Sequence, residues 1–139
     1  MYIKQNFVSS EKVKLFQEGL ANLGGLLPEN KLLILTPKEQ EYKVNGIIIP
    51  GKTGDLPRKG VVIQSGEITE EYRTYKDLIK PGRVITYGLY AGKEAEFPTD
   101  AFPLELLPIL KEQKFTVLSL MEIAYSENNP NNQTSWQKK

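Results

Sequence analysis

The stretch Leu32–Gly66, LLILTPKEQEYKVNGIIIPGKTGDLPRKGVVIQSG, decides the fold. It opens on the apolar run Leu32–Leu35 and closes on Gly60–Ile63, and short aliphatic runs of this kind are typical of buried strands. The residues between them are polar and rich in glycine and proline, which opposes regular structure, except for one apolar triplet, Ile47–Ile49. The stretch therefore predicts two strands joined by a long irregular segment that carries one aliphatic triplet.

Three further short strands are expected in the rest of the chain. Arg83–Tyr87 follows the turn residues Pro81 and Gly82, and Phe115–Leu118 and Met121–Tyr125 come near the C-terminal end. The strands are short and separated by turns, without the spacing of alternating strands and helices. This pattern predicts a mainly β protein, built as a small barrel or sandwich rather than as a parallel sheet.

One amphipathic helix is expected near the N-terminus, over residues 9–23. Apolar residues recur there at helical spacing and form one stripe: Val13, Phe16, Leu20 and Leu23. Ser9 or Ser10 can cap its start, and Gly24 and Gly25 end it. We expect its apolar face to pack on the domain or on a neighbouring subunit.

The chain is long enough for one hydrophobic core with extensions. Residues 98–113 are apolar but contain Pro103 and Pro108, which indicates an insertion that folds back on the barrel with one helical turn. The polar C-terminal residues indicate a disordered tail apart from any docking of Trp136. The expected organisation is an N-terminal helical extension (1–28), a barrel (29–125) with its mobile loop (37–59) and insertion (98–113), and a flexible tail (126–139).

The composition excludes most catalytic chemistry. The chain has no cysteine and no histidine, so disulfides, thiolate nucleophiles, most zinc sites and histidine-based dyads are ruled out. Acidic residues come singly or as exposed doublets, without the pairing that acid–base or metal chemistry needs. We expect no enzyme activity, no cofactor and no metal. The start of the sequence has no signal-peptide pattern, and no apolar run is long enough to span a membrane, which predicts a cytoplasmic protein.

Residues Gly46–Thr53, GIIIPGKT, match the phosphate-loop pattern letter for letter. That loop works by turning its backbone N–H groups onto phosphate and opening a helix. Here the next residues, GDLPRKG, oppose a helix, Pro50 removes a donor, and three isoleucines favour extended backbone. We interpret the match as coincidental.

Taken together, these motifs resemble those of a GroES-type co-chaperonin, the chaperonin-10 family. The glycine and aliphatic triplet of Gly46–Ile49 and the return strand Gly60–Gly66 match its first half. Asp77–Ile85 and Tyr87–Gly92 are similar to its next segments, although Arg83 stands where the family has an acidic residue. Residues Val117–Tyr125 resemble its closing strands. The N-terminal helix, the insertion and the tail are additions to the family pattern, similar to those of phage-encoded members, which suggests a viral origin.

The resemblance implies a co-chaperonin that caps a GroEL-type chaperonin ring as a homo-oligomer, a heptamer in this family, and assists ATP-dependent folding of a client protein. ATP would be bound by the chaperonin. The chaperonin-binding residues would be Gly46, Ile47, Ile48, Ile49 and Pro50. Each buried isoleucine gains roughly 1.5–3 kcal/mol, so an exposed triplet calls for a partner groove.

Three alternatives remain open from the residues. The triplet Ile47–Ile49 could instead be a buried core strand, extended by Tyr42 and Val44. The protein could be a structural or assembly protein of a virion that uses the same barrel. It could also be a nucleic-acid-binding barrel, but 18 basic against 17 acidic residues give a net charge of only +1, which argues against that class.

Overall fold

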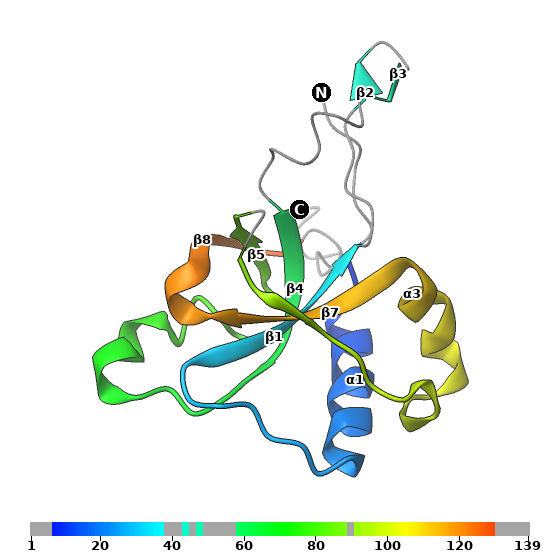
Figure 1. Cartoon of the computed structure of the whole chain (residues 1–139), viewed down its shortest axis with the longest axis horizontal. Helices are drawn as coiled ribbons and strands as arrows, with labels where there is room; N and C mark the ends of the chain where they lie inside the picture. The colour runs from blue at the N-terminus through cyan, green and yellow to red at the C-terminus, as the bar shows by residue number, and fades with distance from the viewer. Residues whose placement is uncertain (1–6, 38–42, 45–46, 49–57, 89–90, 130–139) are drawn as a thin grey trace, which may run out of the picture.

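A six-stranded antiparallel sheet forms the body of the molecule (Figure 1). The computed structural model describes residues 7–37, 43–44, 47–48, 58–88 and 91–129. The strand order is β6-β7-β1-β4-β5-β8, so β1 and β4 lie at the centre. The strands are β1 (Lys31–Pro37), β4 (Arg58–Ser65), β5 (Val84–Tyr87), β6 (Lys93–Ala95), β7 (Gln113–Ser119) and β8 (Ile123–Glu127). The mainly β fold predicted from the sequence is confirmed.

The central strand β1 is buried on both of its faces. Leu33 and Leu35 belong to the cluster on the side of the N-terminal helix, whereas Leu32 and Ile34 belong to the cluster on the opposite side. Successive side chains of a strand point to opposite faces, so a continuous apolar run places residues in two cores at once. This two-sided burial explains why β1 reads LLIL rather than as alternating apolar and polar residues.

The helix α1 (Ser10–Asn22) covers one face of the sheet, as the sequence predicted. Its Phe16 is fully buried and makes edge contacts with the rings of Phe102 and Phe115, at centroid distances of 5.5 and 5.8 Å. The side chain of Gln17 donates a 2.7 Å hydrogen bond to the carbonyl oxygen of Ile63 in β4. The helix therefore shares its core with the sheet.

Two details of the predicted helix differ in the structure. Leu23 is 43% exposed, so it lies outside the buried stripe. The reason is that α1 ends at Asn22, and Leu23 is its C-cap residue, where the chain turns away before Gly24 with a φ of 68°. Ser9 is the N-cap residue by position, but its side chain makes no capping hydrogen bond.

Residues 98–113 contain more helix than the single turn that we expected. They form the 3-10 turns η2 (Thr99–Ala101) and η3 (Leu104–Leu106) and the helix α3 (Leu107–Glu112). Pro103 caps η3 and Pro108 lies in the first turn of α3, positions where the missing N–H of proline costs nothing. The prolines thus begin helical turns here instead of breaking them.

At the end of the sheet where β1 begins, the segment that follows β4 is hydrogen-bonded to Asn30. Asn30, with a φ of 59°, accepts a 3.0 Å hydrogen bond from the backbone N–H of Thr69 and donates one of 3.0 Å to its hydroxyl. A side chain at Gly66 would collide with the carbonyl oxygen of Pro28, so only glycine fits there. The chain then continues as the 3-10 helix η1 (Glu70–Tyr75).

Ordered structure continues past residue 125, where we expected the flexible tail to begin. A 3-10 turn, η4 (Leu120–Glu122), precedes β8, which runs to Glu127. Asn129 is only 3% exposed and donates a 2.6 Å hydrogen bond to the carbonyl oxygen of Val8. The tail predicted for residues 130–139 lies outside the described residues. Among the residues that are described, no helix has the length and apolar character to cross a membrane.

Candidate functional site

The long loop leaves and rejoins the sheet at one end of its two central strands. β1 ends at Pro37 and β4 begins at Arg58, and these antiparallel neighbours pair Leu35 with Val61. Residues 38–57 therefore connect two adjacent strand ends (Figure 1). We call the ordered residues beneath this connection the loop base: Thr36, Pro37, Arg58, Lys59, Gly60 and Tyr87.

Within the loop, the structure describes a small hairpin. The strands β2 (Lys43–Val44) and β3 (Ile47–Ile48) pair Val44 with Ile47 and Lys43 with Ile48. This two-stranded sheet is separate from the six-stranded one. Ile47 and Ile48 are therefore not a strand of the main sheet. The other predicted binding residues, Gly46, Ile49 and Pro50, lie outside the described residues, as does the loop on either side of the hairpin.

The strand β2 was not expected, because the residues before the isoleucine triplet were predicted to lack regular structure. The dipeptide Asn45-Gly46 separates β2 from β3 in the sequence, and this dipeptide between two extended segments is a strong signal for a tight hairpin. The signal was present in the sequence. The extended β3 also supports the rejection of the phosphate-loop pattern, because Ile47 and Ile48 pair with another strand.

At the loop base, the side chains of Thr36 and Tyr87 contact each other across the intervening strand, at the position of Gly60. The hydroxyls of Thr36 in β1 and Tyr87 in β5 lie 2.9 Å apart in a buried hydrogen bond. The strand between them is β4, and a Cβ at Gly60 would lie 2.6 Å from Thr36 Oγ1 and 3.1 Å from the carbonyl oxygen of Leu35. Only a glycine in β4 leaves room for this bond. The bond ties β1, from which the loop leaves, to β5, where Tyr87 pairs with Arg58, the first residue of β4 after the loop.

Burial makes ionisation of Tyr87 still less favourable than in a free tyrosine. Its side chain is 2% exposed, and desolvation raises its pKa above the ordinary tyrosine value. Hydrogen bonds with Thr36 and Thr116 and the charge of Arg58 oppose part of that rise. A protonated phenol can both donate and accept, so the bond with Thr36 stays intact at neutral pH.

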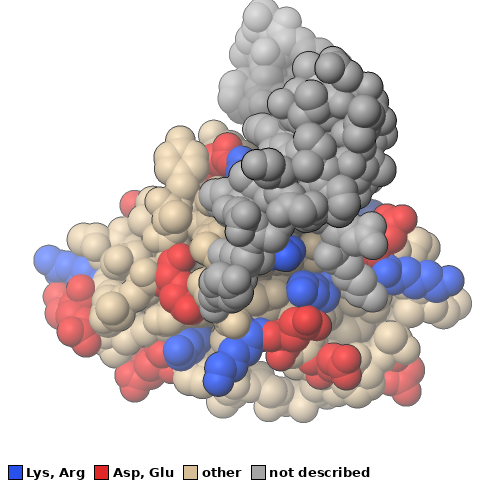
Figure 2. All heavy atoms as spheres, turned by 45° about the horizontal axis from the view of Figure 1, so that its top comes forward, with Lys and Arg blue, Asp and Glu red and all other residues tan. Residues whose placement is uncertain are grey.

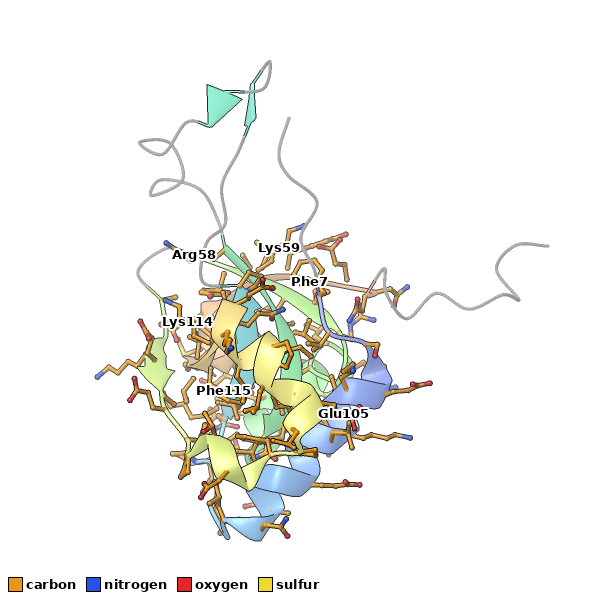
Figure 3. The ribbon with its side chains drawn as sticks, turned by 90° about the vertical axis from the view of Figure 1, so that its right-hand side faces the viewer. Phe7, Arg58, Lys59, Glu105, Lys114 and Phe115 are labelled. Atoms are coloured by element: carbon orange, nitrogen blue, oxygen red, sulfur yellow. The ribbon has the colours of Figure 1, made fainter. Side chains whose placement is uncertain are left out.

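An ion pair joins the returning strand to the edge of the sheet. Lys59 Nζ lies 2.8 Å from Glu127 Oε2, which ties β4 to β8 across β5. The two side chains are 32% and 35% exposed, so the pair contributes only about 0–1 kcal/mol. Figure 3 shows Arg58 and Lys59 at the end of the molecule from which the loop leaves, with Phe7 close by.

Arg83, which departs from the family pattern, anchors the last strand. Its Nε donates a 2.7 Å hydrogen bond to Ser126 Oγ, and its Nη1 donates one of 3.0 Å to Asn128 Oδ1. Ser126 in turn donates a 2.6 Å bond to the carbonyl oxygen of Leu78. These bonds give the basic residue a structural role in holding β8 to the sheet, which the sequence did not indicate.

The surface around these elements carries charges of both signs. Figure 2 shows lysine and arginine side chains interspersed with aspartate and glutamate on the face in view. Several of them pair, for example Lys114 with Glu94 at 3.2 Å and Lys12 with Glu105 at 3.7 Å. The described residues in view form no basic stripe of the kind that would follow a nucleic-acid backbone. In the described part of the chain, no three potential metal-ligating side chains gather.

Comparison with known proteins places the chain among chaperone components. The model of the family described as "Chaperonin 10 Kd subunit" matches residues 28–105. The chain is 36% identical over 67 residues to Co-chaperonin GroES of Bacteroides fragilis, covering 48% of this chain and 71% of that protein. It is 33% identical over 73 residues to Co-chaperonin GroES of Porphyromonas gingivalis, covering 52% and 79%. The Dichelobacter nodosus Co-chaperonin GroES is 29% identical over 69 residues, covering 48% and 73%.

The fold and the loop base thus define a small antiparallel β module that presents a long loop from its two central strands. The matched range contains β1, the whole loop, β4 and β5. The chain belongs to the chaperonin-10 family, as a divergent co-chaperonin of the GroES type, and this family is one of non-enzymatic chaperones. The helix α1 lies outside the matched range.

Proposed function

We propose that this protein caps a GroEL-type chaperonin ring and binds it through the loop tip Gly46–Pro50, assisting ATP-dependent protein folding. The observation that carries the proposal is the geometry of the loop base. The connection 38–57 leaves the sheet from β1 and returns to it at β4, two adjacent central strands, and the Thr36–Tyr87 hydrogen bond ties β1 to β5 across the start of β4. A rigid platform of this kind sets where the loop begins and leaves its tip available to a partner.

The chemistry of the tip suits a groove lined by apolar side chains. Ile47 and Ile48 already have extended backbone in β3, and an extended segment can enter a groove as a short strand. Each isoleucine side chain gains roughly 1.5–3 kcal/mol on full burial, offset by the cost of ordering the loop. The resulting contact of one loop is weak enough to be released.

Several loops acting together would supply the missing affinity. In the described part of the sheet, β6 and β8 are edge strands with one unpaired side each. We place these edges between neighbouring subunits of a closed ring, where they are hidden from aggregation. Seven chains of 15.7 kDa would give a particle of about 110 kDa. A ring presents all its tips to one chaperonin, and avidity multiplies the binding without new contacts. In this scheme ATP is bound by the chaperonin, and the complex works in the cytoplasm.

The test is capture of a purified bacterial chaperonin by this protein, with and without ATP. The test variant changes Ile47, Ile48 and Ile49 to serine. A matched control changes three exposed apolar residues outside the loop to serine: Leu26, Leu104 and Met121, which are 95%, 82% and 72% exposed. We expect capture that needs nucleotide, is lost in the loop variant and is kept in the control. Capture by the loop variant, or loss in both variants, would overturn the assignment of the tip.

A further inference from the structure

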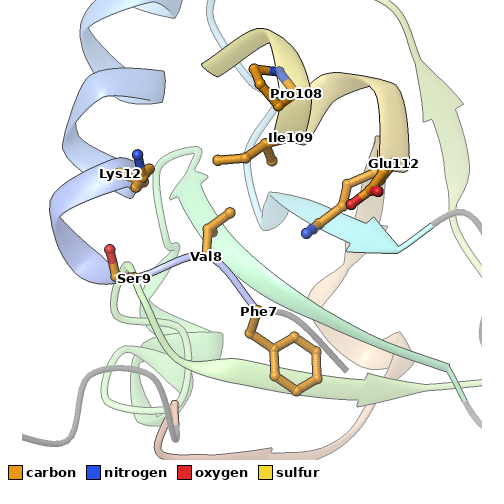
Figure 4. Close-up of a pocket in the computed structure, with 8 residues that line it drawn as sticks. Phe7, Val8, Ser9, Lys12, Pro108, Ile109 and Glu112 are labelled. Carbon is orange, nitrogen blue, oxygen red and sulfur yellow. The ribbon is translucent and has the colours of Figure 1, made fainter. Parts of the chain in front are cut away.

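A pocket lies between the N-terminal segment and α3, at the end of the molecule from which the loop leaves. Its apolar wall is formed by Phe7, Val8, Pro108 and Ile109, and Lys12 and Glu112 stand at its rim. Figure 4 shows Val8 and Ile109 facing the same space from the two sides of the pocket. Gln113, which also lines the pocket, pairs with Pro37, the last residue of β1 before the loop. The pocket therefore adjoins the loop base.

A hydrogen bond holds Asn129, near the C-terminus, beside this pocket. Asn129 is buried and its side-chain amide donates a 2.6 Å hydrogen bond to the carbonyl oxygen of Val8, a residue of the pocket wall. The last described residue, Asn129, therefore lies beside the pocket wall. When extended, the chain from Asn129 to Trp136 reaches at most about 25 Å, which is enough to return to the pocket with slack.

We propose that the segment 130–139 folds back on its own domain and that the Trp136 side chain occupies this pocket. An indole suits the site, because its apolar rings fit a wall of aliphatic and aromatic groups while its N–H stays near the wet rim. The basic residues Lys138 and Lys139 follow directly, and the exposed carboxylate of Glu112 at the rim complements their charge.

The covalent link between Asn129 and Trp136 favours Trp136 over any other occupant of the pocket. A short flexible link holds a segment near its site at an effective concentration on the order of millimolar, far above that of a second copy or of a separate partner. The docked indole would cover the apolar pocket beside the loop base. This inference does not depend on the proposed chaperonin binding, because it concerns only contacts within one chain.

The first test uses Trp136 as its own reporter, since it is the only tryptophan in the sequence. In the full chain, we expect tryptophan emission to be shifted to the blue and shielded from acrylamide, relative to a peptide of residues 130–139. Ile109→Glu should shift the emission to the red and raise the quenching constant to that of the peptide. The control Leu104→Glu, at a residue 82% exposed, should leave both unchanged.

Two results would overturn the proposal. One is emission and quenching in the unmodified chain equal to those of the peptide, which means that Trp136 is in water. The other is a blue shift that disappears on dilution, which means that the indole enters the pocket of a second copy. Circular dichroism of Ile109→Glu reports whether that variant keeps its fold.

A second test needs no substitution inside the pocket. The chain has no cysteine, so Glu112→Cys and Glu29→Cys each give a single site for a nitroxide label, which quenches tryptophan only at close range. Glu112 is at the pocket rim, whereas Glu29 lies before Lys31, beyond the far end of the seven-residue strand β1, roughly 20 Å away. We expect strong quenching of Trp136 from Glu112→Cys and little from Glu29→Cys. Equal quenching from both positions would contradict docking in the pocket.

Discussion

The hydrogen bond between Thr36 and Tyr87 should be an energetically coupled pair at the loop base. Both residues are buried, at 0% and 2% exposure, and their hydroxyls lie 2.9 Å apart. Tyr87→Phe leaves the Thr36 hydroxyl buried without this partner, and Thr36→Val, which keeps the volume, does the same to the phenol. We expect each to lower the free energy of unfolding by about 1–3 kcal/mol.

The double variant separates this bond from other effects of the two substitutions. In the double variant neither hydroxyl of this bond is left without its partner, and only the bond of Tyr87 with Thr116 stays lost, so the double variant should lose less than the sum of the singles, by about 0.5–1.5 kcal/mol. The assay is urea denaturation at one fixed protein concentration, because an oligomer's stability depends on concentration. A matched control pairs Thr36→Val with Tyr125→Phe, whose tyrosine is 62% exposed. Additivity within about 0.5 kcal/mol is expected in the control, and the same additivity for Thr36 with Tyr87 would refute the coupling.

Three further predictions concern stability. Gly60→Ala places a Cβ 2.6 Å from the hydroxyl of Thr36 in β1, so it should lower the free energy of unfolding by about 1–3 kcal/mol in urea denaturation. The control Gly88→Ala, with open space around it, should lower it far less. Equal losses in the two variants would contradict the steric argument. Phe16→Ala should lower the free energy of unfolding by about 3–5 kcal/mol, because the ring of Phe16 is fully buried against two other rings. The control Leu26→Ala, at a residue 95% exposed, should lower it by less than about 0.5 kcal/mol. A small loss for Phe16→Ala would mean that α1 is not part of the core. Burial raises the pKa of Tyr87 in the folded state, so the unfolded chain loses that proton first, and stability should fall as pH rises above about 10. Denaturation across that range should show a smaller fall in Tyr87→Phe, and identical slopes would contradict the assignment.

The strands with strong apolar runs could be predicted from the sequence, and the weaker elements could not. The runs that became β1, β4, β5 and β7 are aliphatic because they are buried, so the pattern reports burial directly. β6, Lys93–Ala95, is an edge strand of exposed and half-buried residues, and its sequence carries no such pattern. β8 starts at Ile123, because the capping box between Ser119 and Glu122 turns the preceding residues into η4.

The loop base shows what a sequence pattern does not contain. The aliphatic triplet and its flanking residues could be recognised as a candidate site, because their composition differs from that of the strands. The contact between Thr36 and Tyr87 joins strands that are not neighbours, so no local periodicity indicates it. A glycine inside a strand, as at Gly60, indicates that other atoms pack closely against the backbone there, but it does not indicate which residues they belong to.

The most direct test of co-chaperonin activity is the refolding yield of a denatured client that needs the chaperonin, measured with chaperonin, ATP and this protein. We expect the yield to rise when the unmodified protein is added and to stay at the level of chaperonin alone when Ile47, Ile48 and Ile49 are serine. The control with Leu26, Leu104 and Met121 changed to serine should restore the full yield. A yield that does not rise with the unmodified protein, or one that rises equally with the loop variant, would contradict capping through the isoleucine tip.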